Sequence, residues 1–293
     1  MLKALFIGFQ YSVPQHLLSR LVGRLARCQQ AWLAQPLIRL FVRHFKVNLS
    51  EAVVTDPKGY ACFNDFFTRA LKPGVRPWAA AAELPQNMLV SPVDATISQA
   101  GPITQGTLLQ AKGQTYSVAS LMGCSEGPTD YDQGAFATLY LSPRDYHRIH
   151  MPCSGQLRKM TYVPGQLFSV NTVTTERVPR LFARNERLIC EFDTASGPMA
   201  LVLVGAMIVA SIRTPWAGVV APTSGRREIT HWDYSDQPLA LARGDEVGAF
   251  LLGSTVVMLT AQAAAWTDSL SPHQPVHCAQ VLGAQEFPQR LQD

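Results

Sequence analysis

Long apolar runs are missing from this sequence of 293 residues. A membrane-spanning helix needs about 18 or more consecutive apolar residues. The longest candidate, residues 199–212, is shorter and contains Gly205, and we interpret it as buried strands. The apolar start, residues 1–9, is broken by Gln10 and leads to no small-residue cleavage site, so it does not predict a signal peptide. We therefore expect no segment that crosses a membrane.

Cysteine patterns are absent as well. The six cysteines form no C-x-x-C pair, which predicts reduced thiols in a cytosolic setting and argues against a disulfide framework or a zinc site. Charged residues make up only 16% of the chain and aromatic residues 9%, and no low-complexity tract occurs. This composition excludes disordered and fibrous classes, and a chain of this length can bury a substantial core.

Acidic residues are missing from residues 1–50, which we call the basic arm. The arm holds seven Lys and Arg and no Asp or Glu before Glu51, so it carries a net charge of +7 against −3 for the remainder. A basic arm on a mildly acidic body indicates an anionic partner, either a membrane surface or a nucleic acid.

Two amphipathic helices are expected within the basic arm, one beginning near Pro14 and the other at Pro36. Arginines lie largely opposite their apolar faces, which carry Leu17, Leu21, Leu25, Phe41 and Phe45. Basic amphipathic helices with aromatic residues, here including Trp32, are typical of proteins that lie on a bilayer surface. The alternative is that these apolar stripes pack against the body of the protein.

After about residue 85 the chain changes to short β-branched and aromatic runs separated by Gly and Pro. The clearest runs are residues 136–141, 200–204 and 255–259. Many short strands predict a sandwich or barrel-like body. We therefore expect an α+β fold with two regions: a helical, basic, membrane-associating region at 1–85 and a β-rich catalytic domain at 86–293.

A Gly253-Ser254 step interrupts the apolar run from Phe250 to Leu259. Gly allows the backbone unusual conformations, and the Ser254 hydroxyl lies next to the carbonyl that precedes it. This arrangement permits attack of the hydroxyl on the peptide bond of the chain itself. The plainer interpretation is a small turn inside a core strand.

Three further segments carry groups that can do chemistry. In residues 142–152, Ser142 with Asp145 three residues later resembles a helix N-cap that precedes His147 and His150. A pair of His three residues apart is weak evidence for a metal without a third ligand, and we expect none. The other two segments, residues 90–95 and 167–171, contain Asp94, Ser169 and Asn171.

Ser, His and Asp together also suggest a serine hydrolase. The sequence has no G-x-S-x-G motif around Ser254 and no Gly-rich loop that would supply an oxyanion hole. A hydrolase triad is therefore the weaker interpretation of these residues.

Six motifs, taken together and in this order, resemble bacterial phosphatidylserine decarboxylase. The resemblance runs from the basic arm to beyond Ser254 and thins toward the C-terminus. Each motif is weak alone, whereas their joint occurrence is highly specific. They are Phe66–Arg69, Ser91–Asp94, Tyr146–Pro152, Leu167–Asn171, Gly244–Gly248 and Leu252–Thr255.

The resemblance implies a proenzyme that cuts itself between Gly253 and Ser254 into fragments 1–253 and 254–293. Ser254 is then the nucleophile, His150 the base that removes its proton, and Asp94 the carboxylate that orients the imidazole. Attack on the Gly253 carbonyl gives an ester. Elimination then gives dehydroalanine, and hydrolysis with loss of ammonia leaves a pyruvoyl group in place of Ser254.

This pyruvoyl group is the implied cofactor, and phosphatidylserine is the implied substrate. The group forms a Schiff base with the substrate amine and accepts the electrons released with carbon dioxide, which leaves phosphatidylethanolamine. His147 is the implied acid that returns a proton to the α-carbon. Ser169 is implied to contact the carboxylate or head group, and Arg69 serves either a phosphate or an ion pair within the fold.

The same resemblance sets the expected partners. They are an anionic membrane surface and the two fragments as a heterodimer, with further dimerisation left open and no nucleic acid. The expected location is the cytoplasmic face of the inner membrane, as a peripheral protein. A pyruvoyl decarboxylase of a soluble amino acid is the nearest alternative, although a soluble substrate gives no reason for the basic arm.

Two positions depart from the family pattern. Ala95 stands after Asp94 where we expect Gly, and Thr172 after Asn171 where we expect another residue. Ala95 affects the placement of Asp94 only if that position needs a positive φ.

Overall fold

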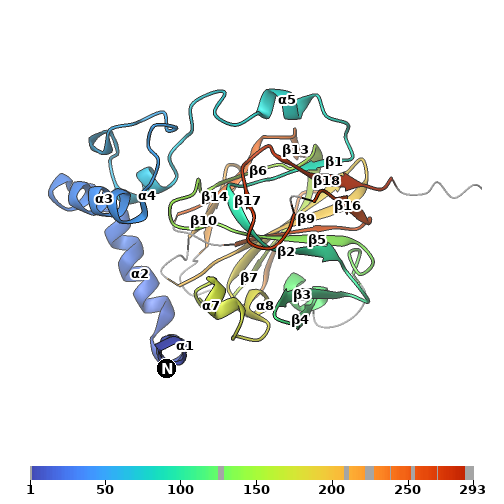
Figure 1. The fold of residues 1–293 in the computed structure, drawn as a ribbon, viewed down its shortest axis with the longest axis horizontal. Helices are drawn as coiled ribbons and strands as arrows, with labels where there is room; N and C mark the ends of the chain where they lie inside the picture. The colour runs from blue at the N-terminus through green and yellow to red at the C-terminus, as the bar shows by residue number, and fades with distance from the viewer. Residues whose placement is uncertain are drawn as a thin grey trace, which may run out of the picture.

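The structure is a computed structural model that describes residues 2–124, 129–207, 211–221, 228–237, 239–251, 255–268 and 270–287. Helices at the N-terminus precede a strand-rich body, as the sequence predicts (Figure 1). The described helices are α1 (Leu2–Ser12), α2 (Gln15–Ala26), α3 (Ala31–Phe45), α4 (Phe63–Phe67), α5 (Trp78–Ala82), α6 (Val118–Met122), α7 (Thr172–Thr175) and α8 (Leu181–Arg184), with a 3-10 turn η1 at Pro57–Gly59.

The body is built around one nine-stranded antiparallel sheet. Its order is β12 (Thr230–Asp233), β7 (Gly155–Val163), β8 (Arg187–Thr194), β9 (Gly197–Val204), β15 (Thr255–Thr260), β5 (Ala135–Tyr140), β2 (Ala95–Pro102) and β17 (Pro275–Val276), with β13 (Leu239–Leu241) also paired to β7.

Three smaller sheets accompany it. One has the order β11 (Gly218–Ala221), β10 (Ile212–Thr214), β14 (Glu246–Phe250) and β6 (Arg148–His150). Another has the order β1 (Met88–Val90), β18 (Val281–Gln285) and β16 (Ala264–Trp266). The last is the hairpin of β3 (Thr107–Ala111) and β4 (Gln114–Ser117).

The large sheet is buried on both faces. In β15, Val256 and Met258 join one hydrophobic core, whereas Val257 and Leu259 join another, because successive side chains of a strand face opposite sides. The first core includes residues of the three- and four-stranded sheets, and the second includes residues of the β3–β4 hairpin, α6 and α8. The predicted sandwich is confirmed, and none of the described sheets closes into a barrel.

The helix predicted at Pro36 begins earlier than the sequence suggested. In α3 the N–H groups of Leu33 and Ala34 donate to the Gln30 carbonyl, and Pro36 lies inside the helix. A proline at this point removes one main-chain hydrogen bond. Packing outweighs that loss, since Phe41 lies 5.0 Å from the Phe63 ring of α4 in an edge-on contact.

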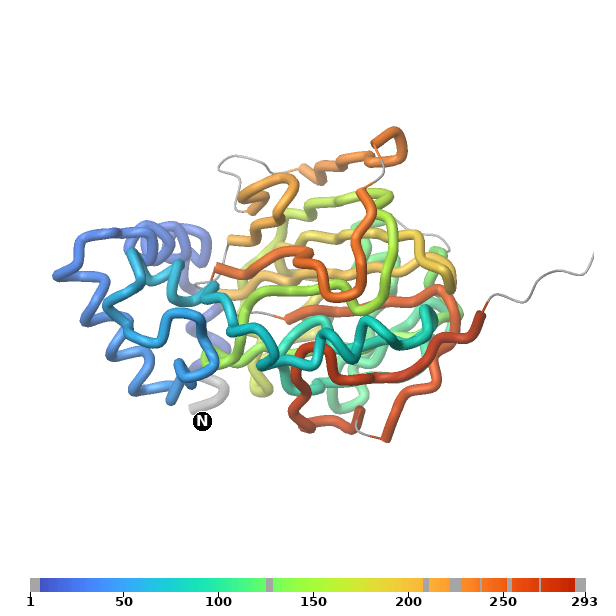
Figure 2. Tube along the Cα trace, turned by 90° about the horizontal axis from the view of Figure 1, so that it is seen from above, coloured from blue at the N-terminus to red at the C-terminus, as the bar shows by residue number. Residues whose placement is uncertain are grey.

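The basic arm stands to one side of the body, joined to it by the segment that carries α4 and α5 (Figures 1 and 2). The expected helix after Pro14 is confirmed as α2. Its apolar stripe stays outside, with Leu17, Leu21 and Leu25 between 42% and 53% exposed. Of the described helices, none has the length and apolarity needed to span a bilayer.

Candidate active site

The Gly253-Ser254 step lies outside the described residues, but both of its flanks are described. Before it, β14 ends at Phe250, whose N–H donates to the His147 carbonyl at 3.0 Å. After it, β15 begins at Thr255, which pairs with Tyr140 on β5. The chain therefore passes from the four-stranded sheet to the centre of the large sheet through this step, and the flank before the step contacts the main chain of His147.

His147 is completely buried and is held as a neutral base. Its Nδ1 lies 2.8 Å from the Asp145 carbonyl, which can only accept, so Nδ1 carries the proton and Nε2 carries the lone pair. Burial, assisted by the positive charge of Arg69, lowers the His147 pKa to about 3. Among the described residues Nε2 has no hydrogen-bond partner, and the centroid of the Phe67 ring lies 4.0 Å from that of the imidazole.

His150 is neutral too, but both of its ring nitrogens are occupied. Nδ1–H donates to the Gly244 carbonyl at 2.7 Å, and the Tyr146 hydroxyl lies 3.0 Å from Nε2 and donates to it. Burial lowers the His150 pKa. Gly244 has φ +93°, and a Cβ there would come within 3.0 Å of Trp78, whose ring lies 5.0 Å from the imidazole. Only glycine fits this turn.

Asp94 is an ionised carboxylate bound to an arginine. Arg76 donates Nε to Oδ1 at 2.9 Å and Nη2 to Oδ2, and the Cys278 N–H donates to Oδ1 at 2.9 Å. Burial alone would raise the Asp94 pKa, but these hydrogen bonds outweigh it and hold the pKa below its ordinary value. Arg76 also donates to Glu51 at 2.9 Å.

The structure brings Asp94 and His150 into one neighbourhood without joining them. Between these two described residues no hydrogen bond is formed, since each is engaged elsewhere. Arg76 and Tyr146 line both a hollow of about 280 Å³ that is also lined by Asp94 and a second hollow of about 610 Å³ that is also lined by His150. Ser254 lies outside the described residues, so the triad of Ser254, His150 and Asp94 stays a prediction.

The expected N-cap at Ser142 takes a different form. Asp145 N–H donates to the Ser142 carbonyl at 3.0 Å, and the Asp145 carboxylate accepts from the Ser142 N–H at 2.7 Å. The single turn expected before the His pair is therefore present, and the Asp145 carboxylate caps it by accepting from the Ser142 main chain.

Arg69 makes no ion pair with a carboxylate of the described residues, so an ion pair within the fold does not explain it. It is 5% exposed, and its Nη2 donates to the carbonyls of Arg144 and Asp145 at 3.0 and 3.1 Å. The Asp145 carbonyl is the one that fixes the His147 tautomer. Arg69 therefore holds in place the Asp145 carbonyl, which accepts the hydrogen bond from His147 Nδ1.

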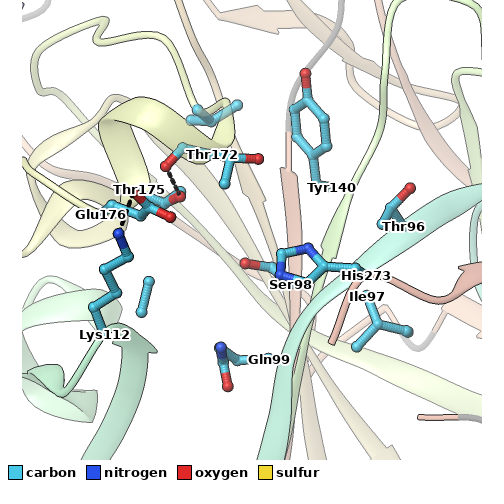
Figure 3. A pocket seen from close by; sticks show the side chains of 12 residues that line it. Thr96, Ile97, Ser98, Gln99, Lys112, Tyr140, Thr172, Thr175, Glu176 and His273 are labelled. Atoms are coloured by element: carbon cyan, nitrogen blue, oxygen red, sulfur yellow. Dashed lines mark hydrogen bonds and ion pairs between the residues drawn. The ribbon is translucent and has the colours of Figure 1, made fainter. Parts of the chain in front are cut away.

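Ser169 lies in the loop between β7 and α7. Its N–H donates to Gln10 Oε1 at 2.8 Å, and the next residue, Val170, lines a cavity of about 170 Å³. Figure 3 shows this cavity between Thr172, Thr175 and the α7 C-cap Glu176 on one side and the side chains of Thr96, Tyr140 and His273 on the other. Tyr140 pairs with Thr255, so the cavity borders the strand that Ser254 precedes.

The two departures from the family pattern have ordinary explanations. Ala95 begins β2, pairs with Val276 and has no positive φ, so this position does not require Gly. Asn171 caps α7 by accepting from the Thr174 N–H at 3.2 Å, and Thr172 is the first residue of that helix.

Sequence reasoning missed Arg76, Trp78 and the hydroxyl of Tyr146. Tyr146 lies in a motif that was recognised, and its position four residues before His150 was the available signal. Arg76 and Trp78 lie in an irregular segment that no pattern connects with Asp94 or His150. Only the tertiary structure identifies them.

Comparisons with known proteins agree with these motifs. The family model described as phosphatidylserine decarboxylase matches residues 63–284, and a model described as PSD matches residues 5–46. A phosphatidylserine decarboxylase proenzyme of Azotobacter vinelandii is 50% identical over 95% of this chain and 97% of its own. A protein of the same name from a Shewanella species is 52% identical over 88% of this chain and 88% of its own. Another from Methylobacillus flagellatus is 54% identical over 89% of this chain and 91% of its own. The chain belongs to the phosphatidylserine decarboxylase family.

Proposed function

We propose that this chain cuts itself before Ser254 and then decarboxylates phosphatidylserine to phosphatidylethanolamine with a pyruvoyl group made from that residue. The observation that carries the proposal is His147: a buried, neutral imidazole whose Nε2 has no partner among the described residues, and whose carbonyl accepts from Phe250, four residues before Ser254. A buried nitrogen without a partner is costly unless it serves a reaction or a ligand.

The neighbourhood of the step fits the proposed group. Thr255 Oγ1, directly after residue 254, is buried and has no hydrogen-bond partner in the part of the chain that the structure describes. A buried polar atom next in sequence to residue 254 suits a small polar group there. A pyruvoyl group supplies an electrophilic carbonyl that accepts the electrons released when carbon dioxide leaves.

The proton transfers are assigned to the two histidines. His150 is proposed as the base for Ser254, which requires the Tyr146 hydroxyl to release Nε2. His147 starts as a proton acceptor because its pKa is about 3. Its Nε2 takes a proton as the substrate amine loses one, and returns that proton to the α-carbon after decarboxylation.

Asp94 supports maturation through charge. A negative carboxylate held by Arg76 near His150 favours the imidazolium that forms when Ser254 loses its proton. Ser169 is proposed to contact the substrate from the loop beside the cavity of Figure 3. The two fragments remain associated as a heterodimer.

Intact-mass measurement of wild-type protein and of Ser254→Ala tests this function. Wild type yields two chains, residues 1–253 and a smaller one with a blocked N-terminus, and releases carbon dioxide from phosphatidylserine. Ser254→Ala stays whole and inactive. Active wild-type protein that remains a single unmodified chain would refute the proposal. Hydrolysis of activated esters by the uncut chain would instead favour a serine hydrolase.

The basic arm favours a lipid substrate over a soluble amino acid. Its arginines Arg20, Arg24, Arg27, Arg39 and Arg43 are exposed and lack carboxylate partners within 4 Å among the described residues. Exposed leucines and Trp32 accompany them. We place the protein peripherally on the cytoplasmic face of the cell membrane, where anionic lipids attract such a surface.

Vesicle sedimentation tests the membrane contact. Replacing Leu17 and Leu21 by Ser lowers binding to anionic vesicles by about tenfold or more, since each apolar side chain contributes about 1 kcal/mol when buried in lipid. The matched control, Leu109→Ser, removes an equally exposed leucine from β3 and leaves binding unchanged. Equal binding of all three proteins would contradict the assignment.

A further inference from the structure

The basic arm contacts the loop that carries Ser169. Resting on the function proposed above, we propose that α1 and α2 form part of the substrate site: Gln10 and Gln15 hold the main chain of residues 165–169. The arm thereby positions the substrate loop as well as the protein on its membrane.

Four consecutive amides of this loop are satisfied alternately by the body and by the arm. The N–H of Gln166 donates to the Arg184 carbonyl at 2.8 Å, and that of Phe168 to the Asn185 side chain at 3.1 Å. The N–H of Leu167 donates to Gln15 Oε1 at 2.7 Å, and that of Ser169 to Gln10 Oε1 at 2.8 Å. The loop therefore lies between body and arm in the way that a strand lies between two neighbours.

The arm's glutamines are committed to this contact. Gln10 is 0% exposed, and Gln15 Nε2 donates to the Gln10 main-chain carbonyl at 2.8 Å, so the Gln15 side chain ties α2 to the end of α1. His16 Nε2 lies 2.9 Å from the Gly165 carbonyl and donates to it. Gln10 Oε1 is used by the Ser169 amide, whereas Gln10 Nε2 is buried without a partner among the described residues. Burying a polar group is unfavourable unless it is hydrogen-bonded, so the bond to the loop is the contact that offsets the burial of Gln10.

Aromatic packing strengthens the same contact. The Tyr11 ring meets Phe168 edge-on with 4.8 Å between centroids, and Arg184 lies 4.9 Å above the Phe168 ring. Arg184 also donates to the Tyr11 hydroxyl at 3.3 Å. Tyr11 of the arm and Arg184 of the body thus both contact the Phe168 ring. These contacts hold Phe168 in place and thereby orient its neighbour Ser169.

The loop continues directly into the wall of the cavity. Val170 and Thr172 line it, and Tyr140 on the opposite side pairs with Thr255, the residue after Ser254. A shift of residues 167–169 would therefore change the cavity next to the proposed reaction centre (Figure 3). The outward face of the same two helices carries Phe9, Leu17 and Leu21, at 57%, 49% and 53% exposure.

The test replaces the two acceptors and leaves the outward face intact. Gln10→Met and Gln15→Met keep the side-chain length and remove the oxygen from a loop amide. Each lowers kcat/KM on phosphatidylserine vesicles by about tenfold, because a buried N–H loses its partner and the loop loses its fixed position. The exposed Gln29→Met in the same arm is the matched control and keeps wild-type kinetics.

Three readouts separate positioning from general damage. Self-cleavage and vesicle sedimentation of the variants remain at wild-type levels, while kcat falls with little change in KM. In wild-type protein, residue-resolved hydrogen exchange shows amides 167 and 169 opening together with α1 and α2, and amides 166 and 168 opening with the body. This exchange measurement needs no variant.

Two results would overturn the proposal. One is a Gln10→Met/Gln15→Met double variant with wild-type kcat/KM. The other is equal protection of all four amides at the level of the body, which decides the matter even where a variant fails to fold. Neither result bears on whether Ser254→Ala stays whole and inactive. The positioning role of Gln10 and Gln15 can therefore be refuted while the proposed function stands.

Discussion

The basic arm and the strand-rich body relate polarity to burial in opposite ways. In the body, Leu201, Val257 and Met258 are 0% exposed. In the arm, Gln10 is 0% and Ser19 4% exposed, while Phe9 and Leu21 are 57% and 53% exposed. The body follows the usual order of a globular protein, whereas α1 and α2 bury a few polar groups and leave large apolar groups exposed beside their arginines. The difference indicates that the arm is completed by something outside the chain.

The largest expected effect lies at the junction of the two regions. Arg76→Met leaves the Asp94 carboxylate buried and uncompensated, which costs about 3–5 kcal/mol in the free energy of unfolding and slows self-cleavage. Urea unfolding and intact mass measure both effects. The control Arg158→Met breaks an exposed cluster with Asp130 and Asp193 and costs at most about 1 kcal/mol. If the two variants lowered the free energy of unfolding equally, the ion pair of Arg76 with the buried Asp94 would matter no more than the Arg158 cluster, contrary to the prediction.

Truncating a leucine compares the regions directly. Leu201→Ala creates a cavity in the body and costs about 2–5 kcal/mol in stability, while Leu21→Ala in the arm costs less than about 0.5 kcal/mol. Chemical denaturation without lipid measures both. A cost above 2 kcal/mol for Leu21→Ala would mean that the arm's apolar face is packed in solution, contrary to the comparison.

Acid sensitivity comes from the body. In the unfolded chain His147 takes up a proton below pH 6.5, whereas in the folded protein the buried imidazole stays neutral down to about pH 3. Stability attributable to His147 is therefore fully present above pH 6.5 and is lost as the pH falls toward 3. His147→Gln shows a weaker loss between pH 7 and pH 5 in urea unfolding. His44→Gln, at an exposed site of the arm, keeps the wild-type pH dependence.

The smallest effect concerns Glu186, which lies under the arm with its Oε2 4.0 Å from His16 Nδ1. Burial raises its pKa to about 7. A folded pKa above the unfolded one gives stability that is present at low pH and lost as the pH rises through 7. Glu186→Gln gains stability over wild type at pH 8 and gains far less at pH 5, as urea unfolding at the two pH values measures. An equal gain at both values would show that titration is not the cause.

The sequence predicted the strands because their patterns depend on local chemistry. Residues 256–259 are apolar at every position, as a strand buried on both faces requires, and β15 occupies Thr255–Thr260. The start of α3 was wrong because tertiary contacts of Phe41 outweigh the preference of Pro36 for a helix start. The predicted boundary between residues 85 and 86 falls in the stretch that joins α5 to β1, and it stays a prediction.

The sequence predicted which residues belong to the candidate site, but it did not predict their arrangement or their hydrogen bonds. Motifs identified His147, His150 and Asp94, and their assigned roles stay predictions. The hydrogen bonds of these residues could not be foreseen, because Gly244, Cys278 and Arg76 come from distant segments. Gln10 and Gln15 had no local signal, since a glutamine inside an amphipathic helix is normally solvated.

The position of β15 has a consequence for the proposed cut. Residues 254–293 would supply the strand between β5 and β9, the edge strand β17, and two strands of the sheet that contains β1. The smaller fragment thus contributes strands to two sheets whose other strands come from the larger fragment. Separating them means breaking both cores, so the nicked molecule unfolds as one cooperative unit with a break in its chain. Fragments made separately would have no folded partner to recognise, and maturation would be irreversible in practice.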